Sequence, residues 1–513
     1  MGVMPAPFVK DLLFKGSDWN FDTLRRTYDA IEQIALGDLG LDVYPNQVEI
    51  ISAEQMLDAH SSVGMPLMYP HWSFGKRFVR EEKLYRKGYT GLAYEVVINS
   101  NPCISYNMEQ NTMAMQALVM AHAAFGHNHF FKNNYLFRQW TAAAGILCYL
   151  EFAKKYVASC EERHGVAAVE DVLDAAHSLM DQGVFRYRRR AKMKTGELEA
   201  RAEARREHEE RAFNDLWRTV PRGREAASKT QDEKDLGERA KKLKLPEENL
   251  LYFLEKHSPA LEQWQRELLR IVRVVGQYFY PQKQTKVMNE GCATFVHYYI
   301  CNKLYDEGRI DEGAILEILH SHSSVVFQPE YDDPRYSGLN PYALGFAMME
   351  DIKRICEEPE AEDREWFPEI AGKGDWRGVL RHAWANYRDE SFIQQYLSPN
   401  VMRRFKLFAV TDKSDDAFVT VAGIHDERGY RKVRETLARS YDLSQAEPDI
   451  QVVDVDFRGD RRLLLQHTMH DGVPLAEKQR DEVLRQLRRL WGYEVSLVGV
   501  DSQTGGRAYE AKE

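Results

Sequence analysis

Three of the sixteen histidines fall within eight residues of one another, at positions 122, 127 and 129. The three histidines lie at the end of a segment that is apolar on nearly every helical face, which predicts a buried helix. A buried imidazole needs partners for both ring nitrogens, and a metal ion can satisfy one nitrogen while a hydrogen bond holds the other. The cluster therefore indicates either a metal site or a hydrogen-bonded polar core.

The spacing of the first two histidines restricts how they could share a metal ion. His122 and His127 are five residues apart, about 140° around a regular α-helix, so both can face one ion only where the helix is distorted. Gly126 would permit such a distortion. Zinc also needs a third protein ligand, and Glu290, in a second predicted helix, offers a carboxylate. We predict zinc, or another divalent transition metal, bound by His122, His127 and Glu290.

Other polar residues near these positions suit a supporting role better than a ligand role. His129 lies two residues past the second predicted ligand, on the opposite helix face if the helix continues. His297 lies seven residues past the third predicted ligand, on the same face but about 10.5 Å along the axis. With Asn128 and Glu95, these residues are predicted as outer hydrogen-bonding partners of the metal centre.

The two halves of the predicted site resemble gluzincin-type metallopeptidases, which read HExxxH followed by a distant Glu-Gly-x-Ala helix. The matching segments are His122-Ala-Ala-Phe-Gly-His127 and Glu290-Gly-Cys-Ala293. Ala123 stands where the catalytic glutamate of that class would be, so no obvious base can activate water. The resemblance also implies an edge strand beside the site helix that holds an extended substrate by strand addition. Catalytic residues stay unassigned on this pattern.

Competing kinds of site have weaker support in the sequence. A dinuclear ferritin-like site requires paired Glu-x-x-His motifs on inward faces. The pair Glu161 and His164 has that spacing, but the surrounding run Cys-Glu-Glu-Arg-His-Gly is charged and predicts a solvent-facing position. The sequence contains no GxxxxGK[ST] loop, no GxGxxG after a strand and no GxSxG elbow.

Helices must position most of these side chains. Apolar periodicity predicts helices over residues 21–39, 113–125, 250–278, 287–304 and 310–320. Residues 94–106 differ, because β-branched residues flank an Asn-Ser-Asn-Pro turn and predict a hairpin just before the histidine helix. After Pro399, strand-like runs alternate with helical segments. The predicted fold is mainly α, with a large gluzincin-like helical body, a β-hairpin and a smaller C-terminal α+β domain.

Changes in composition along the chain predict its division into segments. Residues 1–185 form a helical half with the hairpin and the histidine cluster, and residues 186–246 form a charged helix or linker. Residues 247–400 form a second helical half that carries Glu290 and packs on the first. Residues 401–513 form the C-terminal α+β domain.

Composition excludes several broad classes of protein. The chain has 513 residues, of which 44% are hydrophobic and 29% are charged, with a formal net charge of -10. These values are typical of a globular protein, and the negative charge argues against nucleic-acid binding. No signal peptide and no run of about 18 apolar residues is present, so we expect a cytoplasmic protein without an integral membrane segment. Six scattered cysteines without a CxxC pair predict reduced, mostly buried thiols.

Four long runs of uncommon residues resemble the SpoVR family, and the resemblance spans nearly the full length. The runs are Tyr44-Pro-Asn-Gln-Val-Glu-Ile-Ile51, Gly64-Met-Pro-Leu-Met-Tyr-Pro-His-Trp-Ser-Phe-Gly-Lys-Arg-Phe78, His127-Asn-His-Phe-Phe-Lys-Asn-Asn134 and Asn340-Pro-Tyr-Ala-Leu-Gly345. The resemblance implies a bacterial cytoplasmic protein, linked in spore formers to spore cortex formation and in other bacteria to stationary-phase or stress physiology. It also implies a PrkA-type serine protein kinase as a partner. It supplies no reaction.

Two functions from different classes follow. One is a regulatory scaffold that works with the kinase on cell-envelope remodelling and whose metal is structural. The other is a metal-dependent hydrolase with a non-standard base. Ala123 favours the scaffold, whereas a cluster of Glu49, Glu95, Asn128 and His129 around an open metal position would favour the hydrolase, because another carboxylate could then replace the missing base.

Overall fold

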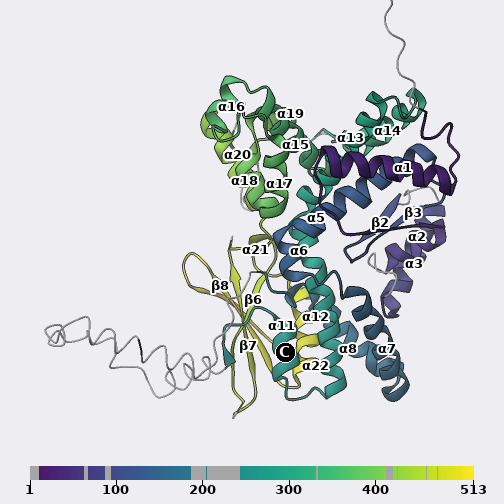
Figure 1. The fold of residues 1–513 in the computed structure, drawn as a ribbon. Helices are drawn as coiled ribbons and strands as arrows, with labels where there is room; N and C mark the ends of the chain where they lie inside the picture. Colours follow the sequence, from purple (N-terminus) through teal and green to yellow (C-terminus); the bar gives the residue numbers. More distant parts are fainter. Residues whose placement is uncertain are drawn as a thin grey trace, which may run out of the picture. The chain divides into compact units, whose positions relative to one another are not determined.

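The computed structural model describes residues 11–62, 68–86, 94–186, 204, 243–330, 333–411, 420–423, 426–457, 459–470 and 472–513 (Figure 1). Two compact units make up the chain, and each consists of two separate stretches of sequence. The first unit contains residues 1–170 and 277–447, and the second contains residues 171–276 and 448–513. The charged segment predicted over residues 186–246 lies almost entirely outside the described residues.

Helices dominate the first unit. Its N-terminal stretch contains α1 (Phe21–Gln33), the π-helix η1 (Ile34–Asp38), α2 (Ala53–Ser61), α3 (Trp72–Arg86), α4 (Met113–Val119), the π-helix η2 (Met120–His127), α5 (Asn128–Asn133), α6 (Tyr135–Trp140) and α7 (Ile146–His164). Its second stretch contains α13 (Lys286–Asp306), α14 (Glu312–Val325), α15 (Pro341–Glu357), α16 (Ala361–Trp366), α17 (Trp376–Asn386), α18 (Asp389–Tyr396), α19 (Pro399–Arg404), α20 (Glu427–Ser440) and α21 (Leu443–Ala446). Two helices, α8 (Val166–Ser178) and α12 (Gln263–Gln284), begin in one unit and end in the other.

A three-stranded sheet in the first unit stands beside the histidine helix. Strand β3 (Cys103–Met108) is central, with β1 (Asn46–Ile51) parallel to it and β2 (Glu95–Ile98) antiparallel to it. The β2 and β3 pair is the predicted hairpin, which the structure confirms. Strand β1 was not predicted, because it pairs with a strand that lies more than fifty residues later. The order β1-β3-β2 leaves β2 at the edge of the sheet. A separate two-stranded sheet joins β4 (Ala409–Thr411) to β5 (Thr420–Gly423).

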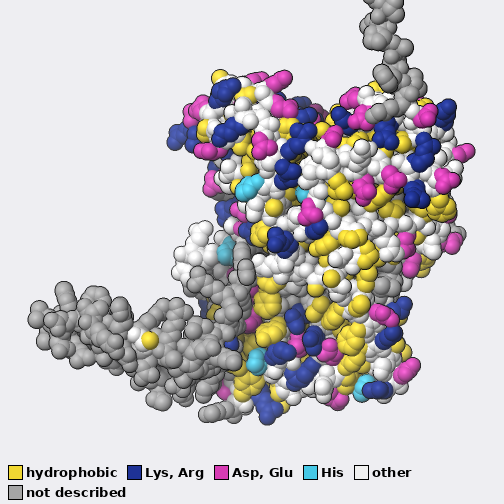
Figure 2. Space-filling view, viewed as in Figure 1, with side chains coloured by type: hydrophobic (Ala, Val, Ile, Leu, Met, Phe, Trp, Pro, Cys, Tyr) yellow, Lys and Arg dark blue, Asp and Glu magenta, His cyan; other side chains and the backbone are white. Residues whose placement is uncertain are grey.

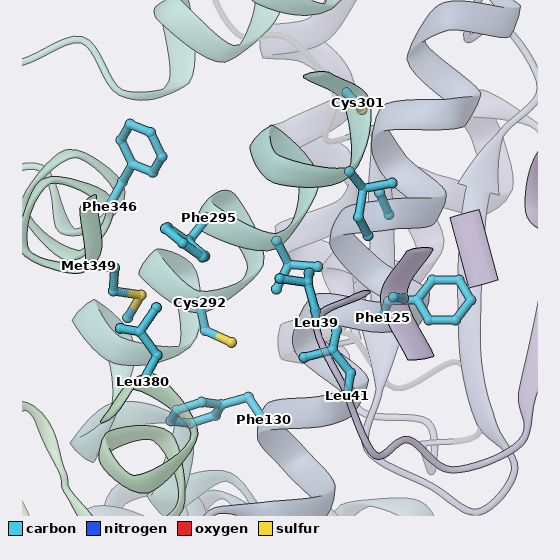
Figure 3. Packing of buried hydrophobic residues seen from close by; sticks show 14 of the residues in the cluster. Leu39, Leu41, Phe125, Phe130, Cys292, Phe295, Cys301, Phe346, Met349 and Leu380 are labelled. Carbon is cyan, nitrogen blue, oxygen red and sulfur yellow. The ribbon is translucent and has the colours of Figure 1, made fainter. Parts of the chain in front are cut away.

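The core of the first unit forms where η2 and α15 pack against α13. Figure 3 shows Cys292 and Phe295 of α13 among side chains of neighbouring elements, including Phe346 of α15 and Phe125 of η2. These four side chains are almost fully buried. Helix α13 is buried along most of its length, which explains why its sequence is apolar on nearly every face.

The second unit is the α+β part of the protein. Its sheet has the order β6-β7-β8-β9, formed by β6 (Asp449–Val455), β7 (Leu463–Met469), β8 (Val495–Asp501) and β9 (Arg507–Lys512). Strands β7 and β8 are parallel and are connected through α22 (Glu477–Trp491), as a parallel pair requires. The unit also contains the short 3-10 helix η3 (Met180–Gln182) and α11 (Leu250–His257). The predicted class, mainly α with a C-terminal α+β region, is therefore confirmed.

The contacts within the units divide the chain differently from the four predicted segments. Residues 401–447 belong to the first unit, where Arg434 Nε of α20 donates a hydrogen bond to the Leu397 carbonyl at 2.9 Å. Residues 448–513 belong with residues 171–276, because Glu247 and Val452 exchange two backbone hydrogen bonds at 2.8 and 3.0 Å. Contacts between distant segments of this kind cannot be predicted from local sequence patterns.

Charged side chains of both signs are interspersed on the face shown in Figure 2, and no single-sign patch dominates it. Within the described ranges, none of the helices combines the length and the apolar character needed to cross a membrane. All six cysteines are free thiols, and Cys148 is the exposed one.

Candidate metal centre

A π-helix brings the two closely spaced histidines onto one face. In η2 the backbone hydrogen bonds run from residue i to residue i+5, so residues five apart lie on the same side. The ring centroids of His122 and His127 are 4.7 Å apart, with the ring planes at 89°. The distortion that the spacing required is therefore present, and π-helical turns are frequent at functional sites.

Gly126 has a different role from the one its flexibility suggested. A Cβ atom at this position would lie 2.5 Å from the Cα atom of Ala293 in α13. A second close approach lies two residues earlier in α13, since a Cβ on Gly291 would lie 2.6 Å from the Cα atom of Gly345 in α15. These glycines let three helix backbones pack closely. The close packing carries Glu290, next to Gly291, toward the two imidazoles.

The three predicted ligands do come together. One ligand atom each from His122, His127 and Glu290 lies within 4.8 Å of the others. Within the described residues, these three form the group of His, Cys, Asp or Glu side chains that could hold a metal ion. The His127 Nε2 atom is 3.6 Å from Glu290 Oε2. Zinc bonds of about 2 Å place donor atoms about 3–4 Å apart, so small side-chain adjustments suffice.

The hydrogen bonds around these residues leave the right atoms available for a metal. The amide oxygen of Asn289 lies 3.0 Å from His127 Nδ1 and can only accept, so Nδ1 is the donor and Nε2 is the nitrogen that could bind a metal. The Glu290 Oε2 atom is buried and has no hydrogen-bond partner. Such an orphaned oxygen is costly unless a cation or donor compensates it. The donor set of two imidazoles and one carboxylate fits zinc.

The helix that carries Glu290 is anchored at its N-terminus. The buried carboxylate of Asp389 in α18 accepts the backbone N–H groups of Val287 and Met288 at 2.8 and 2.9 Å. These donors belong to the first turn of α13, where a helix has no internal acceptors for them. Burial raises the pKa of Asp389 to about 7. The contact holds the start of α13 one turn from Glu290.

A second carboxylate and a phenol face the candidate ligands. The Glu95 Oε1 atom on β2 is 3.8 Å from His122 Nε2. Although 21% of the Glu95 side chain is exposed, burial of its carboxylate, followed by the negative charge of Glu290, raises its pKa to about 7. Burial, followed by the negative charges of Glu290 and Glu95, raises the pKa of the nearby Tyr342 hydroxyl.

Behind His122, two further histidines continue the hydrogen bonding into the protein. The His122 Nδ1 atom is 2.9 Å from His297 Nδ1, and the His297 Nε2 atom is 3.0 Å from His322 Nδ1. The Ala293 backbone acts to raise the pKa of His122, but burial outweighs it. Burial lowers the pKa values of all three imidazoles, that of His322 to about 4. Each ring is therefore neutral at pH 7.

The other predicted outer partners hold a different segment. The Asn128 amide accepts a hydrogen bond from the Tyr44 N–H at 2.8 Å and donates one to the Tyr44 carbonyl at 2.9 Å. The His129 Nδ1 atom lies 3.0 Å from the backbone nitrogen of Asp42. Glu49 lies on β1 and lines a separate cavity of about 530 Å³. Among the four residues named as a possible cluster, Glu95 is the one the structure places against a ligand.

Three residues of the site had no predicted role in it. Tyr342 belongs to the Asn340–Gly345 run that supports the family resemblance, and Asn289 immediately precedes Glu290, so both carried a weak signal. His322 lies near the end of α14, and the structure buries its ring against His297. The contact joins two helices, so no local pattern indicated it.

Comparisons with known proteins agree with these features of the sequence. The family model described as SpoVR like protein matches residues 18–446, and the SpoVR-like C-terminal domain matches residues 448–502. The chain belongs to the SpoVR family. A SpoVR relative from Escherichia coli (strain K12), "Uncharacterized protein YcgB", is 55% identical over 485 residues, covering 94% of this chain and 93% of that protein. No solved structure matches the chain. The junction between the two SpoVR models coincides with the boundary between the structural units near residue 447.

Proposed function

We propose that this SpoVR-family protein is a metal-dependent hydrolase of zincin-like type. His122, His127 and Glu290 hold a divalent metal, for which zinc fits the donor set best. Glu95 takes the role of the general base that is missing at Ala123. The observation that carries this proposal is the position of the Glu95 carboxylate, which lies 3.8 Å from His122 Nε2 and close enough to Glu290 for the two negative charges to interact.

The residues around the site suit hydrolysis. When bound, a divalent metal lowers the pKa of a coordinated water and polarises the bond to be cleaved. In the metal-free chain Glu95 has a pKa of about 7, and the charge of a nearby cation would lower it, so the carboxylate is ionised and able to accept a proton at neutral pH. Asn289 orients His127 through its hydrogen bond to the Nδ1 atom.

The sheet supports an extended amide substrate. Strand β2 carries Glu95 and stands at the sheet edge, with β3 on its other side. A peptide that pairs with this edge by strand addition would run past Glu95 and the ligand cluster. Peptides, including the stem peptides of peptidoglycan, are the substrate class that this arrangement favours.

The cellular setting follows from the family resemblance. We propose that the protein acts in the bacterial cytoplasm, in spore cortex formation or in stationary-phase and stress regulation of the cell envelope, together with a PrkA-type serine protein kinase. A regulatory scaffold with a structural metal is the competing function, and Ala123 is the observation that favours it. Retention of the kinase by the immobilised full-length protein, compared with an unrelated acidic protein, tests the partnership.

Metal content and hydrolysis separate these alternatives. We expect about one zinc per chain in purified protein by elemental analysis, and a loss of that metal in a His122→Ala/His127→Ala double variant. Cleavage of a peptide library should fall by about 10²–10⁴-fold in Glu95→Gln while the metal stays bound. Glu49→Gln, which alters a carboxylate on β1 at the other edge of the same sheet, is the matched control.

Three results would count against the proposal. Equally low metal content in the wild type and the double variant would remove the metal centre. Cleavage unaffected by Glu95→Gln would remove the assigned base. A metal-loaded protein that cleaves no peptide would favour the scaffold.

A further inference from the structure

Three imidazoles form a continuous buried chain that starts at a proposed metal ligand and ends in α14. The nitrogen to nitrogen distances are 2.9 Å between His122 and His297 and 3.0 Å between His297 and His322. All three residues are buried, with exposed fractions of 3%, 1% and 5%. The chain therefore links η2, α13 and α14 through side-chain hydrogen bonds alone.

Counting protons leaves few arrangements for this chain. A neutral imidazole has one N–H donor and one lone-pair acceptor, and each short contact needs one of each. If His122 donates from Nδ1, then His297 accepts at Nδ1 and donates from Nε2, and His322 accepts at Nδ1. If the direction is reversed, His322 donates from Nδ1 and the remaining proton of His122 lies on Nε2. Two arrangements of three neutral rings satisfy both contacts.

Only the first arrangement is compatible with the metal centre. His122 must present an unprotonated Nε2 toward His127 and Glu290 in order to bind a cation there, because a protonated nitrogen has no lone pair to donate. The hydrogen bond of His297 selects this form of His122, and that of His322 selects the required form of His297. The tautomer of His322 in α14 is thus linked to the tautomer of His122 in η2.

We infer that His322, acting through His297, is a positioning residue that selects the metal-binding tautomer of His122. The inference rests on the proposed metal centre and extends it to a helix that contributes no ligand. His322 is held in an otherwise aromatic environment, with its ring centroid 4.7 Å from that of Tyr298 and 4.8 Å from that of Phe346. These rings fill space around the imidazole, so its hydrogen bond to His297 is the feature that orients it.

Zinc affinity in the full-length protein tests the inference. Metal-free protein is titrated with zinc against a chromophoric chelator. His322→Leu removes the acceptor, and we expect a 10–100-fold loss of affinity, the usual effect of removing an outer partner of a ligand. His322→Asn places an amide oxygen near the position of Nδ1, so it should bind zinc within about threefold of the wild type. His320→Leu, on the same helix but exposed, is the matched control and should bind like the wild type.

A spectroscopic measurement on the unaltered protein gives an independent answer. With ¹⁵N-labelled histidine, zinc should drive the His297 and His322 rings to the form protonated at Nε2, with Nδ1 as the acceptor. A zinc-loaded protein with His322 protonated at Nδ1 would overturn the inference even if no His322 variant folds. Equal affinities of His322→Leu and the wild type would overturn it as well. In both cases zinc binding by the wild type would leave the proposed metal centre standing, whereas absence of zinc binding would remove both.

Discussion

At the scale of single residues, a carboxylate with a raised pKa sits beside neutral imidazoles in a buried site. Glu95 comes from a strand and His122 from a π-helix, and their side chains meet at 3.8 Å. The elevated pKa of the carboxyl and the depressed pKa of the imidazole share one main cause, which is burial. Burial therefore favours the neutral form of the His122 ring, which has one nitrogen free to bind a metal.

The titration of Glu95 should respond to zinc. In metal-free protein we expect this carboxyl to titrate near pH 7, far above an exposed glutamate, because burial disfavours its charged form. Bound zinc adds positive charge close to the carboxylate and should shift its pKa downward. Carboxyl ¹³C shifts followed with pH, with Glu95→Gln to assign the signal, measure both values. A Glu95 pKa that zinc leaves unchanged would place the metal elsewhere.

Acid should destabilise the metal-free protein through its buried histidines. The folded-state pKa of His322 is about 4, against the ordinary histidine value of 6.5, so between these values the unfolded chain binds more protons. Stability is therefore complete above pH 6.5 and falls as the pH drops toward 4, by about 1.4 kcal/mol per pH unit for this group. Melting temperatures at pH 7.5 and 5 should differ less for His322→Asn than for the wild type or His320→Asn. Equal differences in the three proteins would contradict this account.

At the scale of elements, the distance between η2 and α13 decides whether the three predicted ligands can meet. Gly126→Ala places a methyl group against the backbone of α13 at Ala293, which cannot yield as a flexible side chain would. We expect a loss of about 1–3 kcal/mol in the free energy of unfolding, the usual cost of overpacking, and weaker zinc binding because Glu290 moves away from the imidazoles. Thermal melting and the chelator titration measure the two effects.

Gly75→Ala is the control for the Gly126→Ala substitution. A Cβ at Gly75 in α3 meets nothing within 4 Å, so the substitution should leave zinc binding unchanged and favour the helix by up to about 1 kcal/mol. A Gly126→Ala protein with wild-type stability and zinc affinity would show that the helices can separate without consequence.

At the scale of the whole molecule, each compact unit is assembled from two distant stretches of chain. A fragment of residues 401–513 would contain α20 without α18 and the four-stranded sheet without α11. In the full chain, the ring centroids of Phe253 in α11 and Trp491 in α22 are 6.1 Å apart. We expect this fragment alone to lack a cooperative melt and to give poorly dispersed amide resonances, because its apolar faces lose their cover. Coexpression with residues 171–276 should restore the fold of the β6-β7-β8-β9 sheet. A cooperative melt of the isolated fragment would contradict the division into these units.

The sequence alone determined the local features of this protein. Apolar periodicity was sufficient for the helices around the site, and β-branched residues flanking a turn were sufficient for the hairpin of β2 and β3. Residue type and spacing indicated His122, His127 and Glu290 as a group, because a metal restricts which side chains can bind it and a five-residue spacing demands a distorted helix.

Tertiary structure decided everything that depends on distant segments meeting. Three contacts join stretches that are far apart in the chain: β1 pairs with β3, Glu95 approaches His122, and His322 contacts His297. The division of residues 401–513 between two units likewise depends on contacts with distant stretches. Periodicity reports which face of an element is buried, but it does not report which other element covers that face. The candidate ligands could therefore be predicted from the sequence, whereas the Glu95 carboxylate near them and the histidine chain behind them could not.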